Sequence, residues 1–295
     1  MSRHDLTDWE WNAIRYFLPV QQSRRGGRPW SDHRQVINGI LWILKTGSPW
    51  RDLPSEFGKW QTVYNRFRRW TVEGLWDRIY ERLLQRAKDL QKIDHGLWCI
   101  DGSVIRAHRC ASGMIPQCEE HDEMVALGRS RGGYSTKLHL LTDGNGYLLS
   151  LTASPGQSHE STEVSCLLAN CRLNLYRRVN RPKRIAGDKG YSSKAIRKLH
   201  EKEITPVIPT RSNETPQLDF DSETYRRRNI VERAIGWLKG SRRIATRYDK
   251  LPAAISLSCY SQLYENLSIP GYETVPRRTH RSPVGSWNSN RQTAK

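Results

Sequence analysis

The sequence predicts a small all-helical domain over residues 1–92, a mixed α/β domain over residues 93–265, and a basic tail over residues 266–295. In the first part, apolar side chains recur with the three-to-four-residue period of helices. In the second part, short apolar runs alternate with helical patterns, as in a sheet covered by helices. Eight of the 11 tryptophans lie in the first 76 residues, so the helical part has bulky side chains for a core. The polar, Pro-rich tail is expected to be disordered.

Capping signals set the predicted helices of the first part. Thr7 and Glu10 have the spacing of a capping box, and a proline ends that helix after "LTDWEWNAIRYFLP". A second helix is expected to end at Gly47, because glycine is the usual residue just after a helix. A third is expected over residues 60–72, and a fourth follows Gly74.

The predicted helix over residues 60–72 has one apolar and one basic face. The apolar face is formed by Trp60, Val63, Tyr64, Phe67 and Trp70. Arg66, Arg68 and Arg69 are expected on the opposite face, where guanidinium groups suit phosphates and base edges. This pattern predicts a helix-turn-helix-like DNA reader, and a purely structural helical bundle is the alternative. The arm "SRRGGRPW" either lies in a minor groove or is a solvated loop.

Strand and helix signals alternate after residue 93. The turn "DGNG" between two apolar runs predicts a β-hairpin. The predicted strands cover residues 97–100, 136–142, 147–153, 184–187 and 205–210, and the predicted helices cover residues 160–176, 194–203 and 222–243. This order predicts a mixed α/β sheet.

The chain has 48 Lys and Arg against 30 Asp and Glu, a formal net charge of +18. An excess of this size predicts a nucleic acid as the partner. No run approaches the roughly 18 apolar residues of a membrane span, so no membrane partner is expected. The six cysteines are scattered, which predicts reduced thiols and a cytoplasmic location. A zinc site at Cys110, Cys118 and His121 is a weaker alternative, because these residues lack a paired CxxC.

Three carboxylates are candidates for a catalytic site. Asp101 and Asp188 each follow an apolar run and precede a glycine, a position where α/β folds often place their sites. Glu232 lies in the predicted helix 222–243, where Lys and Arg outnumber acids nine to two over residues 225–250. Carboxylates suit two Mg²⁺ ions that act on a phosphodiester. Simple Asp-Gly turns and a surface helix with ion pairs are the alternatives.

Tyr225, Arg228, Glu232 and Lys239 share the predicted helix, and on a continuous helix they fall on one stripe about 60° wide. Their spacing matches the YREK signature of DDE transposases of the IS4 and IS5 insertion-sequence families. "IDGSVIRAHRCASG", "SPGQSHES" and "AGDKGYSS" resemble the IS427-like group of the IS5 family, and "NGILWILKTGSPWRDLPSEFGKWQTVYNRFRRW" resembles its N-terminal domain. The resemblance spans about residues 5–260 and leaves the tail unmatched.

The resemblance implies an RNase H-like catalytic domain in which Asp101, Asp188 and Glu232 bind two Mg²⁺ ions, for which Mn²⁺ can substitute. It implies that Tyr225, Arg228 and Lys239 grip transposon-end DNA. Arg131 and Lys137 are further expected DNA contacts.

The implied activity is metal-dependent cleavage of insertion-sequence ends and strand transfer into target DNA. The implied partners are double-stranded DNA, as terminal inverted repeats and target, and further copies of the chain in a homodimer or higher oligomer. A DNA-binding protein that has lost cleavage is the first alternative. A plain Mg²⁺ nuclease of the RNase H type is the second.

Overall fold

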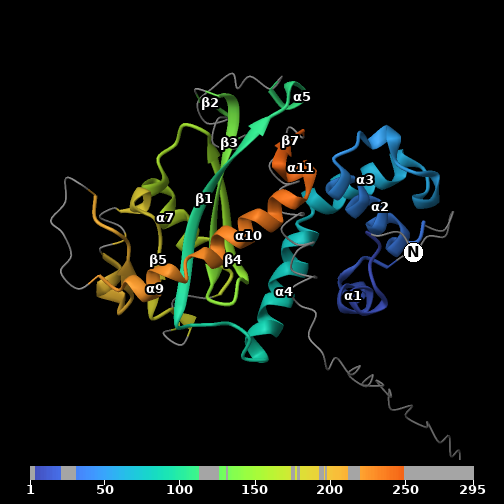
Figure 1. Ribbon diagram of the computed structural model, residues 1–295. Helices are drawn as coiled ribbons and strands as arrows, with labels where there is room; N and C mark the ends of the chain where they lie inside the picture. Colours follow the sequence, from blue (N-terminus) through green and yellow to red (C-terminus); the bar gives the residue numbers. More distant parts are fainter. Residues whose placement is uncertain are drawn as a thin grey trace, which may run out of the picture.

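The computed structural model describes residues 4–20, 31–112, 126–130, 132–173, 177, 180–192, 196, 198–211 and 220–248 (Figure 1). Its helical part contains α1 (Asp8–Ile14), α2 (His33–Thr46), α3 (Trp60–Val72) and α4 (Leu75–Asp89), with short 3₁₀ turns η1 (Arg15–Phe17), η2 (Trp50–Asp52) and η3 (Ser55–Phe57). The predicted helical N-terminal region is therefore confirmed. In Figure 1, α1, α2 and α3 form one group, and α4 lies between this group and the sheet.

The capping signals form as the sequence predicts. The Thr7 side chain accepts a hydrogen bond from the Glu10 amide, and the Glu10 carboxylate accepts one from the Thr7 amide. Gly47 ends α2 with a φ of 73°, and Gly74 begins α4 with a φ of 63°. Both angles lie in the left-handed region, which glycine enters without the steric penalty of a Cβ.

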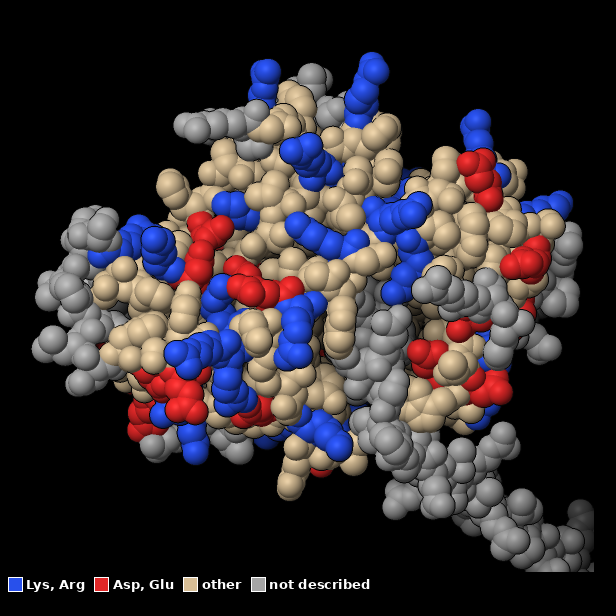
Figure 2. All heavy atoms as spheres, viewed as in Figure 1, with Lys and Arg blue, Asp and Glu red and all other residues tan. Residues whose placement is uncertain are grey.

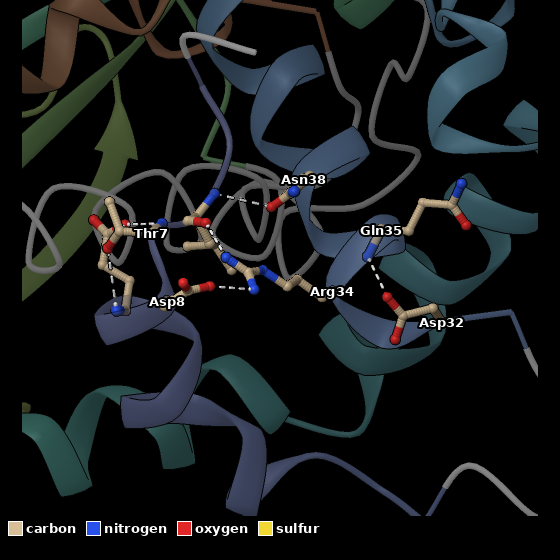
Figure 3. A network of polar contacts seen from close by, with 8 residues as sticks. Thr7, Asp8, Asp32, Arg34, Gln35 and Asn38 are labelled. Carbon is tan, nitrogen blue, oxygen red and sulfur yellow. Dashed lines mark hydrogen bonds and ion pairs between the residues drawn. The ribbon is translucent and has the colours of Figure 1, made fainter. Parts of the chain in front are cut away.

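A polar network ties the start of the chain to α2 (Figure 3). The Arg34 guanidinium binds the Asp8 carboxylate at 2.6 Å and donates to the Leu6 carbonyl at 2.7 Å. The Leu6 amide in turn donates to the Asn38 side chain at 3.0 Å. These bonds fix α1 against α2, and Asp32 caps the start of α2 beside them.

The second part is built on one mixed sheet. Its central path runs β2 (Gly128–Ser130), β3 (Gly133–Asp143), β1 (Leu97–Ala107), β5 (Arg184–Ala186) and β6 (Thr205–Val207), with β4 (Leu148–Pro155) beside β3 and β7 (Thr246–Arg247) beside β1. β1, β5 and β6 are parallel, whereas β3 is antiparallel to β1 and β4 to β3. The described helices and turns of this part are α5 (Arg109–Ser112), α7 (Glu160–Ala169), α9 (Ser222–Arg226), α10 (Asn229–Gly240), α11 (Arg242–Ala245), η5 (Lys189–Tyr191) and η6 (Lys198–Lys202). The predicted mixed α/β, RNase H-like fold is confirmed.

Helices cover both faces of this sheet. Successive side chains of a strand point to opposite faces. Asp101 contacts Arg228 at the start of α10, so α10 lies on the Asp101 face. A Cβ added to Gly102 would meet Tyr191 and Glu160, so α7 lies on the other face. Figure 1 shows α10 crossing in front of β1.

Two structural predictions are wrong at the elements that bear candidate residues. β1 does not end before Asp101 but continues to Ala107. The predicted single helix over residues 222–243 is divided into α9, α10 and α11. At the first break, Arg227 binds Asp94 and Arg228 binds Asp101. Arg227 and Arg228 keep right-handed helical backbone angles at this break, where the hydrogen bonds follow a 3₁₀ pattern. The larger departure from a helix is at Ser241, whose ψ is 110°.

The buried side chains of the helical part and of the sheet belong to one continuous cluster, which includes Trp70 and Trp98. The division at residue 92 therefore stays a prediction. The basic arm over residues 23–30 and the tail over residues 266–295 lie outside the described residues. Within the ranges that the structure describes, no helix is long and apolar enough to cross a bilayer.

We predict that Gly47→Ala destabilises the protein more than Gly74→Ala. Both changes put a Cβ on a left-handed residue, at a cost of about 1–2 kcal/mol. Only the Cβ at Gly47 would also lie 3.0 Å from the Arg242 Cβ, whereas Gly74 has just an arginine nitrogen of Arg78 at 3.8 Å. Urea unfolding of both variants measures the difference. Equal losses would show that α11 moves aside without cost.

Candidate active site

Asp101 and Asp188 are neighbours across the parallel strands β1 and β5. The register pairs Cys99 with Ala186, and its continuation by two residues sets Asp188 opposite Asp101. β5 ends at Ala186, so β1 runs on beside a turn rather than beside a strand. Asp188 caps that turn, η5, by accepting a hydrogen bond from the Gly190 amide at 3.0 Å. The end of β5 thus exposes the middle of β1 and brings the two carboxylates together.

Arg228 lies between Asp101 and Glu232. Its Nη1 is 3.3 Å from a carboxylate oxygen of Asp101, and its Nη2 hydrogen-bonds the Glu232 carboxylate one turn further along α10. Asp101 and Arg228 are largely buried, whereas the Glu232 side chain is 51% exposed. Figure 2 shows a small acidic group on this face with Lys and Arg side chains around it.

The charges of this cluster depend on one another. Burial raises the pKa of Asp101, the Gly102 amide and Arg228 lower it, and Asp188 and Glu232 raise it again. Burial lowers the pKa of Arg228, but Asp101 and Glu232 outweigh that effect and the net shift is upward. The grouped carboxylates repel one another, and the positive charge of Arg228 reduces that repulsion when no metal ion is bound.

The structure separates the other predicted members of the helical stripe. Tyr225 lies on α9, where its ring centroid is 5.7 Å from the Arg228 guanidinium. Lys239 lies two turns along α10 from Glu232, and its amine donates to the Val104 carbonyl of β1 at 3.3 Å. Tyr225 thus packs on Arg228, whereas Lys239 contacts the main chain of β1 farther along α10.

Lys137 lies on the α7 face of the sheet. Its amine donates to the Ser158 carbonyl at 3.0 Å and is 3.6 Å from the Glu160 carboxylate. It holds the loop before α7 against β3, on the opposite face from Arg228. Arg131 lies outside the described residues.

The position of Arg66 differs from the predicted basic face of α3. It is 8% exposed, and its Nη1 is 3.0 Å from Nδ1 of His33 on α2. On a helix Arg66 lies only about 40° from Trp70, at the edge of the packed face, and the two side chains are in contact. The prediction that Arg66 is exposed is wrong, whereas Arg68 and Arg69 are exposed.

Glu160, the first residue of α7, is a carboxylate that sequence reasoning missed. Its Oε2 and an oxygen of Asp188 both lie within 3.0 Å of the point that a Cβ on Gly190 would occupy. Its Oε1 lies 3.5 Å from the corresponding point on Gly102. The two glycines thus leave room for Glu160 beside Asp188. An acidic residue in the first turn of a helix is ordinary, and the one available signal was the place of Glu160 in the motif "SPGQSHES".

The carboxylates fit a divalent cation by their chemistry. Asp101, Asp188 and Glu232 offer the hard oxygen donors that Mg²⁺ prefers. Among the described residues the Arg228 guanidinium, 3.3 Å from Asp101 and hydrogen-bonded to Glu232, supplies positive charge beside these oxygens, so the cluster accommodates a cation. No three His, Cys, Asp or Glu side chains in the described ranges are grouped closely enough to hold a metal ion. Of the weaker zinc set, Cys118 and His121 lie outside those ranges.

Two family models match the chain. Residues 92–256 match "Transposase DDE domain", and residues 6–80 match "Putative transposase of IS4/5 family". A protein of the insertion element IS402 from Burkholderia cepacia, named as an uncharacterized 16.2 kDa protein, is 38% identical over 112 residues, which are 36% of this chain and 76% of the relative. Protein y4sN of Sinorhizobium fredii is 33% identical over 113 residues, which are 38% of this chain and 85% of the relative.

Solved structures of Mos1 transposase resemble this chain only weakly. The Mos1 strand transfer complex aligns with a TM-score of 0.31 and 13% identity, over 83% of this chain and 79% of that chain. The Mos1 paired end complex with Mn aligns with a TM-score of 0.26 and 13% identity, over 83% of this chain and 80% of that chain. These scores are too low to transfer any detail of the site.

We predict that His139→Gln flattens the pH dependence of stability between pH 7 and pH 5. His139 is fully buried between the Tyr191 hydroxyl and the Ser154 hydroxyl. Burial, with a smaller effect of Lys137, lowers its pKa from 6.5 to about 4. The unfolded chain therefore binds a proton below pH 6.5 that the folded protein refuses, and His139 removes about 1–2 kcal/mol of stability by pH 5.

Thermal or urea unfolding at several pH values measures this slope. His200→Gln is the matched control, since His200 is exposed to solvent in the folded protein. An unchanged slope in His139→Gln would contradict the assignment of a neutral, buried imidazole.

Proposed function

Because the chain belongs to the family of transposases with a DDE domain, we propose that it cuts the ends of an insertion sequence and joins them to target DNA. The observation that supports this reaction is the grouping of Asp101 on β1 with Asp188 just after β5, and with Glu232 joined to Asp101 through Arg228. The YREK spacing and the quoted motifs support a finer assignment to the IS427-like group of the IS5 family.

Asp101, Asp188 and Glu232 would hold the metal ions. Bound Mg²⁺ or Mn²⁺ would activate the attacking oxygen and stabilise the leaving oxygen of a phosphodiester. Arg228 orients Asp101 and Glu232 and would add a positive charge beside the scissile phosphate. Water for cleavage and a DNA 3′-hydroxyl for strand transfer would come from outside the protein. No side chain of the chain is required as the nucleophile.

We infer that duplex DNA contacts both parts of the chain. Arg68 and Arg69 are exposed on α3, and Tyr225, Arg228 and Lys239 line the side of α9 and α10 that faces β1. A net charge of +18 favours binding of a phosphate backbone. The helical part would recognise the terminal inverted repeats, and the α/β part would hold the scissile phosphate. A homodimer or higher oligomer would pair the two ends.

We predict that Asp101→Asn, Asp188→Asn and Glu232→Gln each reduce cleavage of terminal-repeat DNA by about 100-fold or more. Each change keeps the shape of the side chain and removes a charged oxygen ligand. DNA affinity measured in EDTA should not fall, and Glu232→Gln can raise it by removing a negative charge from a phosphate site. Gel analysis of labelled duplex with Mg²⁺ measures cutting and joining.

Glu73→Gln, at an exposed acid of the helical part, is the control and should cut normally. If a variant at Asp101, Asp188 or Glu232 cuts at a near-normal rate, that residue is not a metal ligand. A wild-type protein that binds the ends and never cuts would favour the non-cleaving alternative. Cutting without joining would favour a plain nuclease.

We also predict that the three arginines of α3 behave differently. Arg68→Ala and Arg69→Ala should weaken DNA binding and lower its salt dependence, because each exposed side chain releases phosphate counterions. Arg66→Ala should instead lower stability by about 1–3 kcal/mol, because it leaves buried groups around His33 without their hydrogen bond. Salt titrations of DNA affinity and urea unfolding separate the two effects. Stability unchanged in Arg66→Ala would contradict its structural role.

A further inference from the structure

A cavity of about 650 Å³ lies where the helical part meets the far end of β1. Trp50, Trp60 and Tyr64 of η2 and α3 form one wall, and His108, Arg243 and Tyr248 line the side that belongs to the α/β part. We propose that this cavity binds one unstacked nucleobase of the DNA. The inference rests on the proposed function only in taking DNA as the ligand.

The walls are built of aromatic rings and guanidinium groups. Trp50 and Tyr64 pack edge to face with centroids 5.3 Å apart. The Arg243 guanidinium lies 5.4 Å from the Trp50 ring centroid and 5.8 Å from that of Tyr248. The Arg51 guanidinium lies 5.8 Å from the Trp60 ring centroid. Such surfaces bind nucleobases by stacking, and each stacked base adds to the binding affinity whatever its identity.

The charge of the cavity suits a nucleotide. Arg51 and Arg243 line it, and no Asp or Glu occurs among its described lining residues. Arg51 is exposed, so it can meet a phosphate at the entrance. Arg243 is 8% exposed and donates to the Ser48 carbonyl at 2.8 Å, so its charge is fixed in the wall.

A metal ion fits less well, because His108 and Cys110 are the two ligand types among the described lining residues.

The cavity is remote from the carboxylates. His108 follows Asp101 by seven residues along β1, which corresponds to about 23 Å of strand. On a duplex this length covers about seven base pairs. The cavity would therefore anchor a base inside the DNA end rather than the nucleotide at the scissile phosphate. One wall of the cavity belongs to α3, the helix that also bears the exposed Arg68 and Arg69.

The test compares two fluorescein-labelled duplexes that bind the full chain in EDTA. Both have the terminal-repeat sequence, and one has a single unpaired thymine seven base pairs from the end. Fluorescence anisotropy should show at least about fivefold tighter binding of the duplex with the unpaired base, the lower end of what one stacked base contributes. Equal affinities would overturn this inference alone. Absence of binding to both duplexes would overturn the proposed function as well.

Tyr64→Leu should abolish the preference and leave the affinity for the fully paired duplex within about twofold. Tyr16→Leu is the matched control, because Tyr16 lies in the same helical part, is 71% exposed and does not line the cavity. Retention of the preference in Tyr64→Leu would contradict the proposal.

Tyr64 packs against Trp50, so its replacement can lower stability, and a second measurement uses the wild-type chain. A photoreactive 5-iodo-deoxyuridine replaces the unpaired thymine, and mass spectrometry locates the crosslink. Attachment to Trp50, Trp60, Tyr64 or Tyr248 is expected. Attachment confined to residues outside the cavity would overturn the assignment.

Discussion

The Arg228 guanidinium, bound to Asp101 on β1 and to Glu232 on α10, determines much of the structure around the candidate site. Three acidic side chains near the end of β5 would repel one another, and burial makes that repulsion stronger. A cation among them removes part of this cost. At the junction of α9 and α10, Arg227 and Arg228 both bind acids of the sheet region, so these ion pairs hold the junction against the sheet.

The length of the strands decides where this charge gathers. β1 has 11 residues, whereas β5 ends after three, so between Cys99 and the pairing with β7 at Arg106 the described part of the chain places no parallel strand beside β1. Asp101 and the continuation of β5 at Asp188 share the space that opens there. Gly102 and Gly190 keep that space free on the other face, which allows Glu160 to approach from α7.

The positive charge of the chain is divided between structural and exposed arginines. Arg66 and Arg243 are buried against aromatic rings, where their guanidinium groups bind neighbouring polar atoms. Arg68 and Arg69 remain exposed on α3. A net charge therefore overstates the number of side chains that can meet a phosphate backbone. Packing between α2, α3 and the α/β part selects which of them are available, and it also forms the aromatic cavity.

The sequence by itself determined the features that depend on neighbouring residues. These are the capping box at Thr7, the helix end at Gly47 and the hairpin turn that begins at Asp143, since each needs only a few bonds within one segment. The period of the apolar side chains and the order of the predicted strands and helices also predicted the fold class. The candidate carboxylates Asp101, Asp188 and Glu232 could likewise be named from the sequence. Only the tertiary structure decided that Asp101 lies within a strand, that Arg66 is buried, and that Glu160 lies near Asp188. Each of these depends on contacts between segments far apart in the chain, and local periodicity contains no information about which distant side chain will occupy a given space.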